Sequence, residues 1–180
     1  MSNIMQQLRA DHLNFAGLLD RLASELDKIR DIEPAEIELM GEMMHYLTHY
    51  PDAVHHPRED LIFAKLALRD ASTRQAVEEL AQEHRDLADK GQAFLRVLGS
   101  VVDGAMVHRE LLEQCGCDYV EALRAHIRKE ERTVFRRVEA ALAAEDWAEI
   151  EAADERRPDP LFGPIVEQEY RDLFESIARA

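Results

Sequence analysis

The sequence predicts an all-α fold, namely an up-down-up-down antiparallel four-helix bundle with additional C-terminal helices. Only 6% of the 180 residues are aromatic, and Ala, Leu, Glu, Arg and Asp are abundant, as is typical of helix interiors and helix surfaces. Apolar side chains recur three and four residues apart along four long segments, which places them on one face of each helix. The connections between these segments are short, and short connections favour antiparallel neighbours.

The first helix is predicted over residues 3 to 30, and the second over residues 37 to 66. Pro51 and Pro57 lie inside the second segment, where each removes a backbone donor and disturbs the preceding turn. We therefore expect a kink or bulge there, and such distortions often lie beside functional sites. The apolar positions that define the two helices are Ile4, Leu8, Phe15, Leu19, Leu22, Leu26 and Ile29, then Ile37, Met40, Met44, Leu47, Ile62, Phe63 and Leu66.

The third helix is predicted to begin at Ser72 or Thr73, which can cap it, and to fade near residues 99 to 104. The fourth is predicted from about residue 108 to residue 144. We expect residues 1–145 to form the bundle domain and residues 146–180 to form a C-terminal helical extension packed on it. Within that extension, a helix over residues 146 to 157, a loop and a last amphipathic helix are expected.

The composition argues against several classes of function. A formal net charge of -15 repels phosphate backbones and anionic lipid headgroups, so neither nucleic acid nor a membrane is expected as a partner. No basic and apolar leader begins the chain, and no apolar stretch approaches the roughly 20 residues that span a bilayer. Cys115 and Cys117 point to nearly opposite sides of a helix and cannot pair there, which suits a reducing compartment. We expect a cytoplasmic protein, and a homodimer stays open.

Four histidines lie on the apolar stripes, one on each helix. A single histidine on an apolar face is more often a hydrogen-bonded core residue than a ligand, so their distribution is the informative observation. Two of them are followed four residues later by glutamate, and residues four apart stack on the same helical face. A carboxylate inside a core is costly unless it is paired or bound to a metal. The two pairs are His55 with Glu59 and His126 with Glu130; the other two histidines are His12 and His84.

The heights of these side chains in the bundle also agree. At a rise of 1.5 Å per residue, His12 and His84 lie roughly 15 Å from one end, and both glutamates lie about 16 to 20 Å from it. His55 and His126 come about one turn higher. The six side chains can therefore face one another and hold two metal ions bridged by the carboxylates. This mixture of imidazole and carboxylate suits iron best, with manganese or zinc less favoured.

These residues resemble the hemerythrin-like, or HHE cation-binding, family, which has one histidine on helices one and three and HxxxE on helices two and four. The resemblance spans most of the chain and includes ADH at 10–12, HHPREDLIF at 55–63, QEH at 82–84, HIRKEE at 126–131 and DPLFG at 159–163. It implies a non-haem di-iron centre, that is two iron ions, with roles in oxygen or nitric oxide binding, redox sensing or iron handling.

One position departs from the oxygen-carrying hemerythrins, which have two histidines four apart on the third helix. Here His84 is followed four residues later by Ala88, so one iron loses a nitrogen ligand and reversible oxygen carriage is less supported. His56 is the candidate to replace that ligand, because it adjoins His55 and is turned by about 100° on an ideal helix. Its facet has few large apolar neighbours, which leaves a wet surface as the alternative. His45 and His49 form a rival pair on the same facet.

Two classes of function share this site. A binding or sensing protein adds a small ligand, oxygen, nitric oxide or peroxide, and releases it unchanged. A di-iron enzyme acting on peroxide or nitric oxide needs an acid-base group and a substrate cavity beside the metals, and an iron storage or handling protein is a further alternative. The sequence has no Ser-His-Asp arrangement and no glycine-rich phosphate loop. We therefore expect a binding or redox-sensing protein rather than an enzyme.

Overall fold

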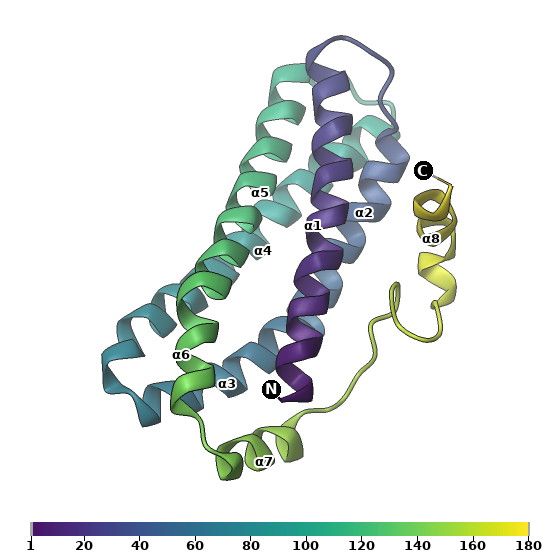
Figure 1. The fold of residues 1–180 in the computed structure, drawn as a ribbon. Helices are drawn as coiled ribbons and strands as arrows, with labels where there is room; N and C mark the ends of the chain where they lie inside the picture. The colour runs from purple at the N-terminus through teal and green to yellow at the C-terminus, as the bar shows by residue number, and fades with distance from the viewer. Residues whose placement is uncertain (1, 180) are drawn as a thin grey trace.

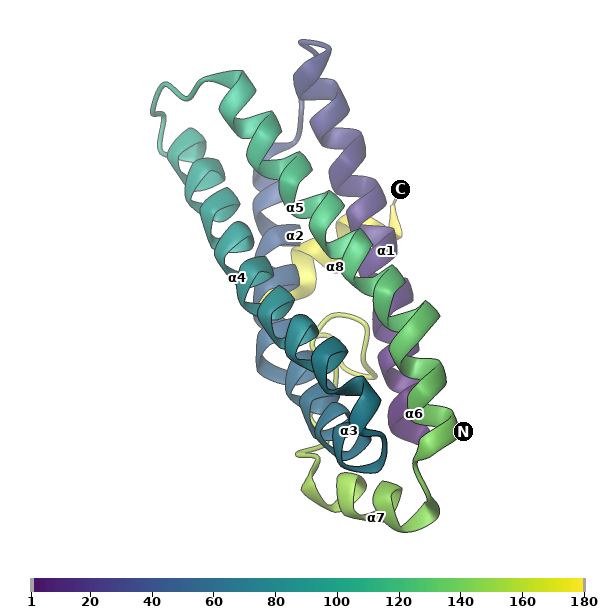
Figure 2. The same ribbon diagram turned by 90° about the vertical axis from the view of Figure 1, so that its left-hand side faces the viewer.

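The computed structural model describes residues 2–179, and these residues form an all-helical bundle, as predicted. The chain rises through α1 (Asn3–Arg30) and returns through α2 (Ile37–Tyr50) and α3 (His56–Arg69), as Figure 1 shows. It rises again through α4 (Arg74–Val102) and descends through α5 (Arg109–Lys129) and α6 (Phe135–Ala141). α1 and α4 each pack beside both α2 and α5, so the four long segments enclose one core (Figure 2).

The second and fourth segments each contain one widened π turn, over residues Pro51–His55 and Glu130–Val134. The first confirms the distortion predicted at Pro51, which has no amide hydrogen to continue the helix. The second π turn was not predicted, because no proline marks it. Within it the Thr133 hydroxyl donates to the carbonyl of Lys129, a bond that competes with the helical ladder and bends helices. Both π turns therefore lie at the glutamate and histidine pairs singled out in the sequence.

The apolar core is divided in two by a layer of buried polar side chains. The larger cluster fills the end that contains Phe15, Leu87 and Leu123, and the smaller one fills the end that contains Leu8 and Leu80. On α1 the interval between the clusters holds Asp11 and His12, and on the other three long segments it holds the predicted ligands. The interruption occurs at the same level in all four segments, as the comparison of their heights predicted.

Close packing of α1 on α5 depends on a glycine. A Cβ atom at Gly116 would lie 2.4 Å from Cδ2 of Leu26 and 2.8 Å from Cζ of Phe94. Real side chains do not approach so closely, so any larger residue would have to push these two side chains apart. The cost of a glycine inside α5 is thus offset by the short distance between the two helices.

The C-terminal residues lie against the bundle. α7 (Ala144–Ala153) packs on α3, and α8 (Arg171–Ala178) packs on α2 after a long connection (Figure 1). The connection is held by Asp159, which accepts a 2.7 Å hydrogen bond from the Tyr46 hydroxyl. Leu161, Tyr170 and Leu173 are buried in the larger apolar cluster. Within residues 2–179, no helix combines the length and the apolar character that crossing a membrane requires.

Candidate metal centre

One half of the polar layer takes its histidines from α1 and from the π turn that precedes α3. Nε2 of His12 lies 3.2 Å from Nε2 of His55, so the two imidazoles present their inner nitrogens to the same space. Oε1 of Glu59 lies 3.3 Å from Nε2 of His55 and 3.7 Å from Nε2 of His12. Oε2 of Glu130 lies 3.3 Å from Nε2 of His12. Two nitrogens and two carboxylate oxygens therefore converge on one position.

The other half is formed by α3, α4 and the end of α5. Oε2 of Glu59 lies 3.4 Å from Nε2 of His84, and Oε1 of Glu130 lies 3.2 Å from Nε2 of His126. The ring of His56 stacks on that of His84 with 4.0 Å between centroids, and His56 is buried. Donor atoms of His56, Glu59, His84 and His126 all lie within 4.8 Å of one another. This half therefore offers three imidazoles and two carboxylates.

Six inner donor atoms have no hydrogen-bond partner. They comprise both carboxylate oxygens of Glu59, both of Glu130, and Nε2 of His84 and of His126. Buried polar atoms are nearly always hydrogen-bonded, and both glutamates are completely buried. So many unsatisfied donor atoms facing one small space fit a site for cations, which satisfies them all at once.

The outer ring nitrogens are held by a second set of carboxylates. Nδ1 of His55 lies 3.0 Å from Asp11, Nδ1 of His12 lies 2.9 Å from Glu131, and Nδ1 of His126 lies 2.9 Å from Glu83. Nδ1 of His56 lies 3.2 Å from Asp52. A histidine that binds metal through one nitrogen almost always donates the other N–H to such a partner, which fixes the ring and its tautomer. The outer carboxylates thus aim Nε2 of these rings inward.

Comparison with protein-family models identifies the family of this chain. The model described as hemerythrin HHE cation binding domain matches residues 3–138, which is most of the chain. The chain belongs to this family. No curated protein and no solved structure matched it. The matched residues include every helix that contributes a side chain to the layer, and the buried histidine and glutamate cluster is that of a metal-binding protein.

The hemerythrin-type cluster also carries an unusual distribution of protons when no metal is bound. Burial opposes a charge on His12, but Glu130 and Glu131 outweigh it and raise the pKa of His12 to about 10. Burial likewise opposes a charge on His84, whose pKa Glu130 and Glu59 raise to about 10. Glu59 is buried beside Glu130, yet His55 and His84 lower its pKa to about 2. Protonated imidazoles therefore neutralise the two glutamates in the metal-free protein.

All seven residues predicted as ligands are brought together in this layer: His12, His55, His56, Glu59, His84, His126 and Glu130. His56 is buried rather than part of a wet surface, and its ring packs on that of His84 from α4. The rival pair lies elsewhere, because His49 is exposed and its ring packs on that of His45, 3.9 Å away. Sequence reasoning missed the outer carboxylates; Asp11 could have been found, because it falls on the apolar stripe of α1.

A cavity of about 290 Å³ opens onto the second half of the layer. His56 and His84 form its inner wall, Asp60 and Arg85 lie at its sides, and Ala88 lies where oxygen-carrying hemerythrins have a further histidine. Partial desolvation raises the pKa of Asp60, although 63% of its side chain is exposed. The small side chain of Ala88 thus leaves room beside the metal-binding donors.

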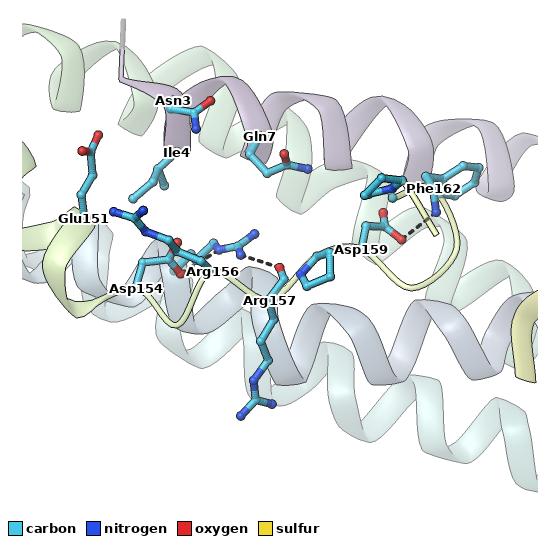
Figure 3. Close-up of a pocket in the computed structure, with 13 residues that line it drawn as sticks. Asn3, Ile4, Gln7, Glu151, Asp154, Arg156, Arg157, Asp159 and Phe162 are labelled. Carbon is cyan, nitrogen blue, oxygen red and sulfur yellow. Dashed lines mark hydrogen bonds and ion pairs between the residues drawn. The ribbon is translucent and has the colours of Figure 1, made fainter. Parts of the chain in front are cut away.

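A second cavity, of about 480 Å³, lies between the start of α1 and the connection from α7 to α8 (Figure 3). It does not reach the inner donor atoms. Its wall includes Gln7, which donates a 3.0 Å hydrogen bond to Asp11. It also includes Arg58, which precedes Glu59 and donates to Asp154 and to the carbonyl of Arg157. The C-terminal connection is thereby hydrogen-bonded to the residue that precedes Glu59.

Proposed function

We propose that the protein is a cytoplasmic, non-haem di-iron protein that binds or senses oxygen, nitric oxide or redox state. The observation that carries the proposal is the position of the two glutamates. Each turns one oxygen toward the His12 half of the layer and the other toward the His84 half. A carboxylate in that position can bridge two ions, and the five histidines supply nitrogen donors on both sides. The proposal takes residues 1–145 as an up-down-up-down bundle and residues 146–180 as its extension.

The donor set is compatible with iron and disfavours copper(I). Imidazole nitrogens and carboxylate oxygens suit iron, manganese and zinc, whereas copper(I) favours thiolate or thioether sulfur. Cys115 and Cys117 are free and lie on α5 several turns before His126, so the layer contains no thiolate. When bound, the iron pair would supply redox chemistry and a coordination position for a small ligand. The protein's own residues hold the ions, fix the ring tautomers and exclude water from the closed half.

The cavity beside Ala88 supports a small ligand. It is walled by two of the imidazoles, and its volume admits a diatomic molecule or a peroxide beside the second metal position. Asp60 and Arg85 place a carboxyl group and a cation at its sides. The same two side chains favour the alternative function, a di-iron enzyme that reduces peroxide or nitric oxide, because such an enzyme needs an acid-base group there.

The test is to load the protein anaerobically with ferrous iron and to add oxygen, nitric oxide or hydrogen peroxide separately. A binding protein gives a new absorption spectrum that reverts when the gas is removed. An enzyme consumes many equivalents of peroxide or nitric oxide per chain, and Asp60→Asn slows that turnover without changing the iron content. Iron-loaded protein whose spectrum responds to none of the three would contradict the proposal.

A further inference from the structure

Three of the four tyrosines form a line of neighbouring aromatic rings that leads outward from the metal cluster. The rings of Tyr50 and Tyr46 stack with centroids 5.5 Å apart and an angle of 14° between planes. Tyr46 meets Tyr170 edge to face at 5.6 Å, and Tyr170 stacks on His45 at 5.7 Å. All three tyrosines are buried, with 4% or less of each exposed. Centroid separations of this size are those of aromatic rings in direct contact.

The inner end of the line is connected to the metal cluster by hydrogen bonds. The Tyr50 hydroxyl donates to Oδ2 of Asp11 at 3.2 Å, and the same oxygen lies 3.0 Å from Nδ1 of His55. A second route passes through Phe15, whose ring lies 5.0 Å from that of His55 and 6.2 Å from that of Tyr50. Tyr50 is therefore one hydrogen-bonded residue away from a metal-binding imidazole.

Each phenol in the line has its own carboxylate. Tyr50 donates to Asp11, and Tyr46 donates to Oδ2 of Asp159 at 2.7 Å. Figure 3 shows Asp159 held in place by the backbone N–H of Phe162, which donates to its other oxygen. Burial and the neighbouring Glu169 raise the pKa of Tyr170 to about 12. Buried phenols stay protonated at neutral pH, so their oxidation requires a base that takes the proton at once. The carboxylates provide that base.

Tyr119 offers an internal contrast. It is as buried as the other three and lines a small space beside His56, yet its hydroxyl donates to the backbone carbonyl of Leu47 at 3.0 Å. A carbonyl oxygen accepts a hydrogen bond but does not take the proton. Tyr119 is therefore close to the cluster without the feature that the other tyrosines share.

The outer end of the line reaches a surface cavity of about 440 Å³ between α2 and α8. Tyr170 and His45 form part of its wall, and Glu38, Glu42 and Glu169 give it an acidic rim. Figure 1 shows α8 lying along the outer side of the bundle beside α2. A neutral or cationic reductant can therefore approach the last tyrosine.

We propose that Tyr50, Tyr46 and Tyr170 conduct oxidising equivalents from the metal cluster to this cavity when the iron-loaded protein meets a peroxide. In the oxidised protein, one hydrogen peroxide accepts two electrons and two protons and leaves as two waters. Two phenols lose one electron and one proton each and become neutral tyrosyl radicals, and the iron ions end as they began. A radical at Tyr50 is refilled by Tyr46, and one at Tyr46 by Tyr170. Each tyrosine that is oxidised gives its proton to the carboxylate beside it, which is Asp11, Asp159 or Glu169, and takes the proton back when it is reduced. The inference rests on the proposed di-iron centre.

The experiment mixes oxidised, iron-loaded protein with hydrogen peroxide and freezes it within milliseconds for electron paramagnetic resonance. A parallel sample contains a nitroso spin trap, and the trapped residue is located by mass spectrometry. The wild-type protein is expected to give a tyrosyl radical signal and a trapped adduct at Tyr170. Tyr46→Phe should lose the Tyr170 adduct and keep a radical at Tyr50, whereas Tyr119→Phe should match the wild type. Tyr170→Phe is a second variant in case Tyr46→Phe does not fold, because it leaves the hydrogen bond from Tyr46 to Asp159 intact. In Tyr170→Phe the adduct should move to another site.

Iron content and peroxide consumption are measured on the same samples, which separates this inference from the proposed function. If two irons are bound and peroxide is consumed but no tyrosyl radical forms, the tyrosine line is refuted and the di-iron proposal stands. An unchanged Tyr170 adduct in Tyr46→Phe, or a main adduct at Tyr119, also overturns the inference. If the protein binds no iron, the di-iron proposal fails and the inference fails with it.

Discussion

Glu59 and Glu130 face each other across the bundle, and each has one oxygen turned toward His12 and the other toward His84. The distances to Nε2 of His12 are 3.7 Å from Oε1 of Glu59 and 3.3 Å from Oε2 of Glu130. Those to Nε2 of His84 are 3.4 Å and 3.7 Å from the other two oxygens. Neither carboxylate belongs to one half of the site alone. The two halves therefore share their anionic donors, and the loss of one glutamate affects both.

Replacing Glu59 by glutamine is expected to abolish binding of the metal pair. The amide has the size of the carboxylate but lacks its charge and one of its two acceptor oxygens, so it cannot bridge two cations. The matched control is Asp60→Asn on the next residue, whose side chain is 63% exposed. We expect this control to keep both metals. Metal analysis of both variants after desalting checks the prediction. Loss of metal from Asp60→Asn alone would show that Asp60, and not Glu59, lies on the metal-binding face of α3.

Replacing His56 by alanine is expected to leave about one metal per chain. His56 supplies the third imidazole of the half that has Ala88 in place of a histidine, so that half depends on it most. The matched control is His49→Ala, one of the rival histidines, which is exposed and packs its ring on that of His45. The control should bind two metals. Two metals in His56→Ala would instead show that a water or an incoming ligand fills that position.

Replacing Asp11 by alanine is expected to weaken metal binding by about 10- to 100-fold, the usual effect of removing a carboxylate that orients a histidine ligand. Asp11 is completely buried. It accepts hydrogen bonds from Gln7 and Tyr50, and it lies 3.0 Å from Nδ1 of His55. Asp20→Ala on the exposed side of the same helix is the control. Titration with ferrous iron measures both affinities. Asp11→Asn should recover part of the loss, because its amide oxygen can still hold the ring of His55.

Metal uptake at pH 7 is expected to release at least two protons per chain. The pKa values of His12 and His84 are raised to about 10, so both imidazoles are protonated in the metal-free protein and must become neutral to bind. Affinity should then rise by about tenfold per pH unit for each proton released. Calorimetric titration in buffers of different ionisation enthalpy counts the protons. Uptake without proton release would contradict the proton distribution described for the cluster.

The stability of the metal-free protein should change with pH for the same reason. A group whose pKa is raised on folding stabilises the fold fully below its unfolded pKa, about 6.5 for histidine. That contribution is lost as the pH rises through the folded pKa of about 10. The melting temperature of metal-free protein should therefore fall between pH 7 and pH 10. The metal-loaded protein has neutral imidazoles already and should not show this loss.

The ligand layer was predictable because its residues obey helical geometry. His55 with Glu59 and His126 with Glu130 are four residues apart, and His12 and His84 fall at the same height on apolar stripes. The π turn at residues 130–134 was not predictable, because no proline marks it in the sequence. Glu83 and Glu131 were missed for another reason: on a helix with many acidic residues, nothing in the sequence separates an orienting carboxylate from a solvated one.

The arrangement of the C-terminal residues was also only partly predictable. An amphipathic last helix follows from its apolar spacing, and α8 is the result. The hydrogen bond from Tyr46 to Asp159 joins residues 113 apart in the chain, and no local pattern predicts such a contact. This bond places a carboxylate of the connection before α8 beside the middle tyrosine of the line. The proton acceptor of Tyr46 therefore could not be predicted from the sequence.

The number of metal ions per chain tests the central claim most directly. Protein purified from iron-replete cells, or reconstituted anaerobically, is to be analysed for metal and protein by independent quantitative methods. Two bridging carboxylates and histidines on both sides of them offer more donors than one ion can use, so the expected result is about two irons per chain. A reproducible value near one in the fully loaded wild-type protein would contradict the paired site.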